Sequence, residues 1–206
     1  MNSKPQEKIV YTIGCSTHSE QSFIDLLKKY HINVLIDVRS IPYSLHTPQF
    51  NKEALMSALS KNCIRYMSFA EEFGARRKEP EAYTANHVDF QKVMNLPVFL
   101  KGVERVKNGI EKGYKIALMC TEKNPEDCHR FSLVSRGLKK KANIDAVHIL
   151  FNGQIQTTEQ IEEKILSQNN ILNDLFLGDN SIEKVYQIIE NHIAFTVNEK
   201  AVDYGK

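Results

Sequence analysis

The residues of this sequence that are best suited to chemistry lie in one stretch, LMCTEKNPEDCHR, which ends at Arg130. The stretch contains Cys120 and Cys128, and His129 and Arg130 follow the second cysteine directly. A thiolate is a nucleophile and a metal ligand, an imidazole carries protons near neutral pH, and a guanidinium binds phosphate or carboxylate through two donors. The stretch is therefore a candidate for nucleophilic catalysis, metal binding or anion binding.

Two more polar groups follow apolar runs elsewhere in the chain. Ser16 comes after IVYTIG, and Asp37 and Arg39 come at the end of INVLIDVR. Asp37 and Arg39 are separated by one residue, so on a strand both would point to the same face. Two interpretations stay open. Either the two charges form a structural pair, since burying one alone is costly, or Arg39 and Arg130 converge on a phosphate or carboxylate.

A metal site is a further hypothesis. Cys120, Cys128 and His129 have the side chains of zinc ligands, but they lack the C-x-x-C spacing of structural zinc sites. A fourth ligand would have to come from another strand end, for which Cys15 is the candidate. Cys128 also lies on an apolar helical stripe with Phe131, whereas the adjacent His129 would point in another direction. We therefore favour Cys128 as a core residue and Cys120 as the nucleophile or thiolate.

The pattern of apolar residues predicts alternating strands and helices. Strands are expected at residues 9–14, 32–38, 64–69, 114–120 and 146–151, and helices at 19–30, 51–62, 98–112 and 124–141. The last of these helices should start with Asn124 as its N-cap and Pro125 at its first position. Residues 71–95 are polar and irregular at first, as in an insertion.

This alternation predicts an α/β fold with a mostly parallel sheet and helices on both faces. In such folds ligands bind beyond the carboxyl ends of the strands. Ser16, Asp37 and Cys120 each end or follow an expected strand. We therefore expect their side chains to meet at one edge of the sheet.

The composition changes in the last quarter of the chain. From residue 152 the sequence is rich in Asn, Gln, Glu and Ile, with helical patterns at 158–167 and 181–195. We therefore divide the chain into an α/β domain, residues 1–151, and a helical C-terminal extension, residues 152–206, that packs on it.

Composition also excludes several classes of protein. With 42% hydrophobic and 25% charged residues the chain is expected to be globular, and its net charge of +2 is too small to imply a polyanion partner by itself. We expect no signal peptide, no membrane partner and a cytoplasmic location, where the 4 cysteines stay reduced. No G-x-G-x-x-G motif supports a dinucleotide cofactor. A metal is the one cofactor that the residues suggest, and nothing in the sequence indicates an oligomeric state.

The chain resembles the DUF488 family, which is named for its unknown function. The matching stretches lie within residues 10–151: Tyr11–Gly14, Asp37–Arg39 with Pro42 and Ser44, Pro48–Asn51, Ile64–Tyr66, Gly74 with Arg76 and Arg77, Leu118–Cys120 with Glu122, and Cys128–Arg130. Members usually have histidine where Cys15 stands and a second glycine where Ala75 stands, which argues against an acid–base role at position 15. The resemblance implies a cytosolic α/β domain with a polar cluster formed by these motifs, and it brings no known reaction.

A fainter similarity is to rhodanese domains. Residues 33–39 are similar to their early strand, and Cys120 stands where their sulfur-carrying cysteine ends a later strand. That cysteine lies in a glycine-containing loop whose N–H groups surround the sulfur, whereas residues 121–125 contain no glycine and include Glu122. Because a nearby acid disfavours an anionic persulfide, this similarity ranks below the first.

We expect an enzyme that acts on a phosphate-bearing ligand, a nucleotide or nucleic acid, at the carboxyl edge of the sheet. The predicted catalytic residues are Cys120, His129 and Asp37, and the predicted anion-binding residues are Arg39, Arg130, Ser16 and Arg76. The alternatives are a non-catalytic nucleic-acid-binding module that uses the basic segment 65–78, rhodanese-like sulfur transfer through Cys120, and a metal-binding protein with Cys120, Cys128 and His129 as ligands.

Overall fold

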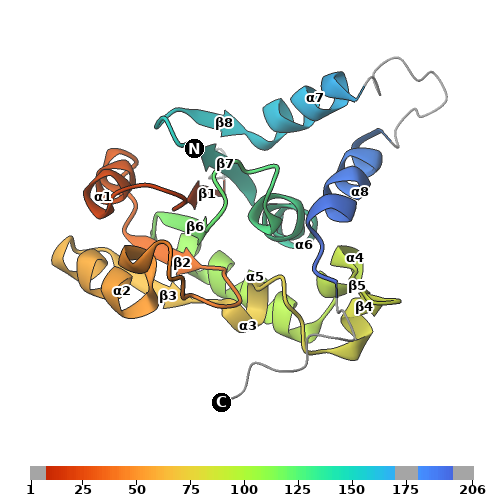
Figure 1. Cartoon of the computed structure of the whole chain (residues 1–206), viewed down its shortest axis with the longest axis horizontal. Coiled ribbons are helices and arrows are strands. Elements are labelled where there is room, and N and C mark those ends of the chain that lie inside the picture. Colours follow the sequence, from red (N-terminus) through yellow and green to blue (C-terminus); the bar gives the residue numbers. More distant parts are fainter. Residues whose placement is uncertain (1–7, 170–180, 197–206) are drawn as a thin grey trace, which may run out of the picture.

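A six-stranded sheet forms the centre of the molecule (Figure 1). The computed structural model describes residues 8–169 and 181–196. The strand order is β3-β2-β6-β1-β7-β8, in which every pair is parallel except β7 with β8. The strands are β1 (Ile9–Gly14), β2 (Val34–Asp37), β3 (Arg65–Ser68), β6 (Ile116–Cys120), β7 (Asp145–Ile149) and β8 (Ile155–Thr157). The predicted α/β fold with a mostly parallel sheet is confirmed.

Helices cover both faces of this sheet, as successive strand residues show. Val34, Ile36 and Leu118 belong to a core cluster with the helices on one face, whereas Leu35 and Met119 belong to a second cluster with the helices on the other. Both faces are apolar, which is why the strands read as continuous hydrophobic runs. The first face is covered by α5 (Pro97–Glu111) and α6 (Arg136–Ala142), and the second by α1 (Glu20–Lys29) and α2 (Lys52–Lys61).

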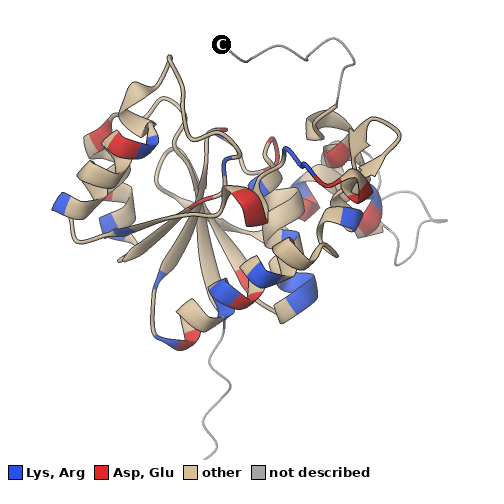
Figure 2. Cartoon of the chain, turned by 90° about the horizontal axis from the view of Figure 1, so that it is seen from below, with Lys and Arg blue, Asp and Glu red and all other residues tan. Residues whose placement is uncertain are grey.

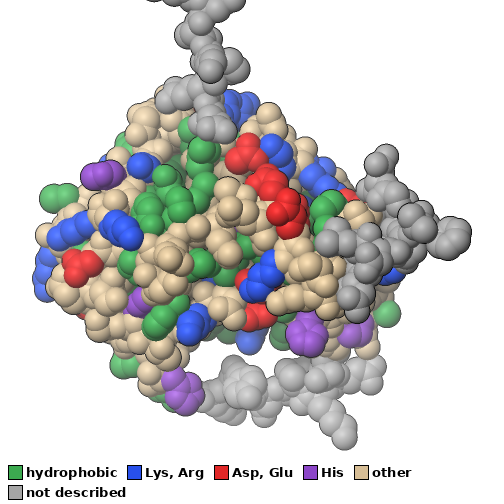
Figure 3. Space-filling view, turned by 90° about the horizontal axis from the view of Figure 1, so that it is seen from above, with side chains coloured by type: hydrophobic (Ala, Val, Ile, Leu, Met, Phe, Trp, Pro, Cys, Tyr) green, Lys and Arg blue, Asp and Glu red, His purple; other side chains and the backbone are tan. Residues whose placement is uncertain are grey.

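Most charged residues lie in the helices and loops around the sheet rather than in its strands (Figure 2). On the face seen in Figure 3, basic and acidic side chains are interspersed around a group of hydrophobic ones. This mixture agrees with the small net charge of +2. None of the described helices combines the length and the apolar character needed to cross a membrane.

The segment that follows β3 is part of the core, so the prediction of an insertion at residues 71–95 is wrong. Phe73, Phe90 and Val93 from this segment are fully buried in the cluster with α5. These residues lie in separate short elements and do not recur with one regular period. The sequence pattern therefore did not reveal that they share an apolar face. The short elements after β2 are the 3₁₀ turn Pro48–Phe50, α3 (Ala70–Phe73), the 3₁₀ turn Pro80–Ala82, β4 (Tyr83–Thr84), β5 (His87–Val88) and α4 (Phe90–Val93).

The helix after β6 begins later than predicted. Residues 121–128 form bends and turns, and the helix starts at His129, first as a π-helical segment, Arg130–Ser135, and then as α6. Pro125 does not open the helix, because its carbonyl oxygen accepts from the N–H of Cys128 in a separate turn. Asn143 ends α6 in the left-handed conformation, a common helix C-cap.

The C-terminal part of the described chain adds β8, α7 (Thr158–Gln168) and α8 (Ser181–Ile193). These helices share a hydrophobic cluster with Phe131, in which Ile161 and Val185 are fully buried. The predicted helices at 158–167 and 181–195 are therefore present, while residues 170–180 of the predicted linker lie outside the described residues. The division of the chain at residue 152 stays a prediction.

His148 joins this C-terminal part to the sheet. Its ring is fully buried, with Nδ1 2.8 Å from Oγ1 of Thr12 and Nε2 3.1 Å from Oγ1 of Thr158. Burial, and after it the charge of Arg130, lower the pKa of His148 from its ordinary value of 6.5 to about 3. The ring is therefore neutral in the folded protein at every pH at which the protein is normally handled.

His148 should make folding stability fall as the solution becomes acidic. Above the unfolded pKa of 6.5 neither state binds a proton at this ring, and between 6.5 and about 3 only the unfolded chain does. Between about pH 7 and about pH 5, the wild type should lose about 2 kcal/mol more than His148→Asn in urea unfolding. His46→Asn, at an exposed position, is the control and should follow the wild type. Parallel losses in wild type and His148→Asn would contradict the prediction.

Candidate functional site

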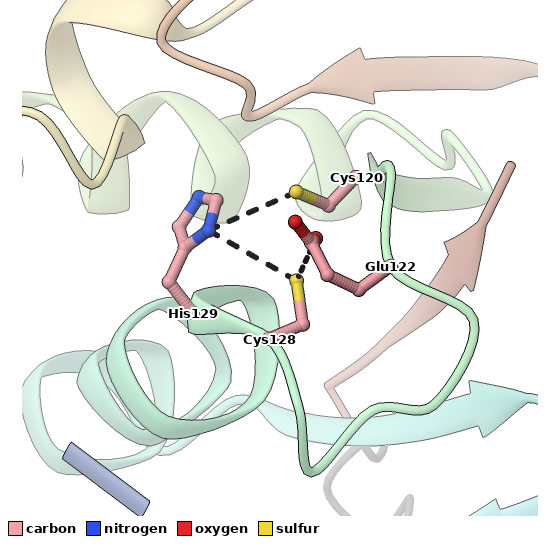
Figure 4. A group of neighbouring side chains, drawn as sticks. All are labelled: Cys120, Glu122, Cys128 and His129. Carbon is pink, nitrogen blue, oxygen red and sulfur yellow. Dashed lines mark hydrogen bonds between the residues drawn. The ribbon is translucent and has the colours of Figure 1, made fainter. Parts of the chain in front are cut away.

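Four metal-ligating side chains meet at the carboxyl end of β6 (Figure 4). Cys120 ends the strand, Glu122 follows in the loop, and Cys128 and His129 lie where the loop enters the helix. Their ligand atoms all lie within 4.8 Å of one another. The two cysteines and His129 are buried, and Glu122 is the least buried member. We call these four residues the Cys–Glu–His cluster.

The imidazole of His129 is held in one orientation by the backbone of the neighbouring strand. Its Nε2–H donates to the carbonyl oxygen of Val38 at 3.1 Å, because a carbonyl can only accept. Nδ1 then points at both sulfur atoms, 3.7 Å from Sγ of Cys120 and 3.9 Å from Sγ of Cys128. A backbone carbonyl on the outer nitrogen is the usual partner of a metal-binding histidine. The inner nitrogen is therefore free to act as a ligand or as an acid–base group.

The acidic groups of the cluster share their protons. Burial raises the pKa of Cys120 well above its ordinary value, and the bond to Cys128 and the charges of Cys128 and Glu122 add to this. Burial alone would raise the pKa of Cys128 too, but the bond from Cys120 and the charges of Arg130 and His129 hold it well below its ordinary value. Of the two cysteines, Cys128 is therefore the one that loses its proton more readily.

Glu122 is the proton-sharing partner of Cys128. Burial, followed by the charge of Cys128, raises the pKa of the Glu122 carboxyl group. Its Oε2 accepts a hydrogen bond from Sγ–H of Cys128, with 2.8 Å between the two atoms. The pKa of His129 is raised as well: burial opposes this, but the Cys128 thiolate and the Val38 carbonyl oxygen favour the charged ring.

Two buried groups fix the loop that carries Glu122. Arg130 is fully buried, and its Nη1 and Nη2 donate to the carbonyl oxygens of Glu122 at 2.8 Å and Lys123 at 3.2 Å. Gly14, at the end of β1, lies so close that a Cβ atom there would overlap the carbonyl oxygen of Glu122. Anion binding by Arg130 stays a prediction, and it would require the carbonyl groups of the bent loop to release the guanidinium.

Asp37 and Arg39 form the structural pair that was one of the two interpretations from sequence. Arg39 donates from Nε to Oδ1 at 2.9 Å and from Nη2 to Oδ2 at 2.7 Å, and both side chains are buried. The hydroxyl of Tyr66 also donates to Oδ2, and Arg39 Nη2 donates to the carbonyl oxygen of Phe50. Catalysis by Asp37 and anion binding by Arg39 stay predictions, and each would require this pair to open.

The remaining predicted residues lie outside the cluster. Ser16 is half-buried, and its N–H donates to the carbonyl oxygen of Thr121 at 2.8 Å, so it pairs with the loop through its backbone. Arg76 is exposed, with its guanidinium 5.2 Å from the ring centre of Phe195. Cys15 is buried and is not among the four clustered ligands; Glu122 takes the place proposed for it.

The structure unites the three predicted metal ligands and adds one that the sequence analysis missed. The divergence expected of Cys128 and His129 does not occur, because Cys128 precedes the helix instead of lying on its first turn. The signal for Glu122 was its position two residues after Cys120, in a loop that returns to a second cysteine. The C-x-x-C pattern concerns sulfur ligands alone, so it gives no signal for a carboxylate ligand.

Comparison with known protein families shows which family the chain is similar to. Residues 19–136, more than half of the chain, match the family described as domain of unknown function DUF488. The chain belongs to the DUF488 family. The matched span contains the whole Cys–Glu–His cluster, with Arg130 and the Asp37–Arg39 pair. No curated protein matches the chain, and the fainter similarity to rhodanese domains stays a prediction.

Replacing Gly14 by alanine should destabilise the protein, because the new methyl group would push against the carbonyl oxygen of Glu122. Crowding of this kind in a packed interior costs about 1–3 kcal/mol. Urea unfolding measures the loss. Gly109→Ala is the control: its Cβ would meet only the end of the Ile116 side chain, and alanine is the better helix former. Equal stability of Gly14→Ala and wild type would contradict the proposed close contact.

Proposed function

We propose that this DUF488 protein binds one metal ion in the Cys–Glu–His cluster and that the ion is the centre of its function. The observation that supports the proposal is the convergence of two sulfurs, one imidazole nitrogen and one carboxylate within 4.8 Å. Thiolate, imidazole and carboxylate together suit a borderline-soft divalent ion such as Zn²⁺ or Fe²⁺. Four such donors match the coordination number that zinc prefers in proteins.

The spacing of the donors agrees with a tetrahedral ion. With Zn–S of about 2.3 Å and Zn–N of about 2.0 Å, sulfur and nitrogen ligands lie roughly 3.5 Å apart. The corresponding distances from His129 Nδ1 are 3.7 Å and 3.9 Å. The Cys128–Glu122 distance of 2.8 Å is shorter, so the carboxylate would move outward when an ion replaces the shared proton.

A metal would also supply the positive charge that an anionic ligand needs, since the neighbouring arginines already make internal bonds. Arg39 is paired with Asp37, and Arg130 donates to two carbonyl groups of the loop. An anionic ligand, the class expected from the sequence, would then bind the ion itself. Because Glu122 is the least buried donor, it is the one that such a ligand would displace. This supports a centre that exchanges ligands, since structural zinc sites are closed by four strong donors.

The other hypotheses have weaker support. In the basic segment 65–78, Arg77 is buried and paired with Glu79, while Arg65 lies over the ring of Tyr114. These contacts leave fewer positive charges for a nucleic-acid backbone than the sequence suggests. For sulfur transfer, the loop after Cys120 turns the carbonyl groups of Glu122 and Lys123 inward to Arg130, whereas an anionic sulfur needs N–H groups.

Elemental analysis of protein purified without chelator should find one zinc or iron ion per chain. Substitution of any ligand, as in Cys120→Ser, Cys128→Ser, His129→Gln or Glu122→Gln, should weaken binding by at least about tenfold, since even the outer-shell partners of metal ligands contribute that much. Titration with Zn²⁺ or Co²⁺ measures the affinity, and thiolate-to-Co²⁺ absorption reports the sulfur ligands.

Cys15→Ser and Cys63→Ser are the matched controls, because they remove a buried and an exposed thiol outside the cluster. Both variants should retain the ion. A wild-type protein without stoichiometric metal that also fails to take up Zn²⁺ or Co²⁺ would overturn the proposal. Loss of the ion from Cys15→Ser with retention by Glu122→Gln would assign the fourth ligand to Cys15 instead.

Removing the ion should lower the melting temperature of the wild type. A ligand that binds only the folded state stabilises it by about 4 kcal/mol when its free concentration is a thousand times Kd. Thermal unfolding with added Zn²⁺ and with excess chelator measures this difference. Cys128→Ser, which lacks one buried donor, should show little or none of it. An equal shift in the variant would place the stabilising ion elsewhere.

A further inference from the structure

We infer that Cys120 and Cys128 are a reversible disulfide site, and that a hydroperoxide which oxidises them releases the ion. The inference rests on the proposed function for the ion, but formation of the disulfide does not. The two sulfurs flank one imidazole nitrogen, at 3.7 Å and 3.9 Å, and lie within 4.8 Å of each other. They are therefore the two thiols that the fold has already brought together.

The backbone between the cysteines allows the sulfurs to close the remaining distance. Residues 121–128 contain no regular helix or strand. The first part of this loop is fixed, since the carbonyl groups of residues 121, 122 and 123 each accept a hydrogen bond. Among the described residues, the second part makes two backbone bonds outside regular elements, from Cys128 N–H to the carbonyl oxygen of Pro125 and from Phe131 N–H to that of Cys128. Side-chain bonds join Asn124 to Asp127 and Lys164 to Glu126. A movement of Cys128 toward Cys120 therefore disturbs few interactions.

The cluster also offers a path for a small oxidant and a group that handles protons. Glu122 is the least buried member and covers the sulfur of Cys128 at 2.8 Å, so outward movement of its carboxylate admits a molecule of the size of hydrogen peroxide. His129 Nδ1 lies beside both sulfurs and can give a proton to a leaving oxygen.

The oxidation takes place in two steps. One thiolate attacks an oxygen of the hydroperoxide: an S–O bond forms, the O–O bond breaks, and the other oxygen leaves as water or alcohol after taking a proton. The second thiolate then attacks the resulting sulfenic acid: an S–S bond forms, the S–O bond breaks, and hydroxide leaves and is protonated to water. The two sulfurs together lose two electrons, and the hydroperoxide gains them.

Disulfide formation and metal binding exclude each other, because both use the same sulfur lone pairs. After oxidation the ion keeps only Glu122 and His129 as protein donors, so its affinity falls. Reduction by a thiol restores the two sulfur ligands. The cluster would thus hold its ion under reducing conditions and lose it under oxidising ones.

The test uses the full-length, zinc-loaded wild-type protein and stoichiometric hydrogen peroxide. A colorimetric zinc indicator follows release, and thiol titration counts the 4 cysteines. Trypsin separates the two residues, since it cleaves after Lys123 and Arg130; the predicted disulfide joins residues 116–123 to residues 124–130. We expect one zinc released per disulfide, loss of two thiols, and recovery of both with dithiothreitol and Zn²⁺. Cys15→Ser and Cys63→Ser should respond like the wild type.

The outcomes separate this inference from the proposed function. A protein that binds zinc but forms sulfinic acids, or a disulfide that involves Cys15 or Cys63, overturns the inference and leaves the metal centre in place. A protein that binds no metal overturns the proposed function. Peroxide treatment and peptide mapping of that metal-free protein would still show whether Cys120 and Cys128 join.

Discussion

Arg130 is the buried charge on which the shape of the site depends. Its guanidinium is enclosed completely and donates to the carbonyl groups of Glu122 and Lys123, which bends the loop after β6 back over the start of the helix. That bend brings Glu122 beside Cys128. A buried positive charge needs a compensating negative one, and the charge of Arg130 lowers the pKa of Cys128 and so favours its thiolate form. The arginine therefore shapes the loop and balances the charge of its thiolate.

The Asp37–Arg39 pair supports the cluster from the neighbouring strand. Asp37 Oδ1 accepts from the backbone N–H of Arg39 as well as from its side chain, which fixes the peptide on both sides of Val38. The carbonyl group of Val38 is the one that orients His129. Asp37 and Arg39, which the sequence suggested for chemistry, thus act on the cluster through the backbone, while their predicted roles in catalysis and anion binding stay predictions.

The sequence predicted what depends on local pattern. Buried strands, the capped helix that begins after Ser19, and the position of Cys120 at a strand end follow from apolar period and residue type. The meeting of Cys128 and His129 in the cluster does not follow from them, because the helical pattern predicted that their side chains diverge. The late start of the helix does not follow either, because Asn124 and Pro125 satisfy the local rules for a helix start. The loop's contacts with Gly14, more than a hundred residues away, and with Arg130 outweigh these local rules.

The hydrophobic cluster of α7 and α8 includes Phe131, which directly follows the arginine that shapes the loop. The ring of Phe131 stacks on Tyr186, 5.6 Å between centres, and lies 5.3 Å from His148. Any protein or small molecule that pulled α8 away would leave this aromatic side chain in water and remove the packing behind Arg130. A change in the packing of the C-terminal helices would therefore be transmitted through Phe131 and Arg130 to the Cys–Glu–His cluster.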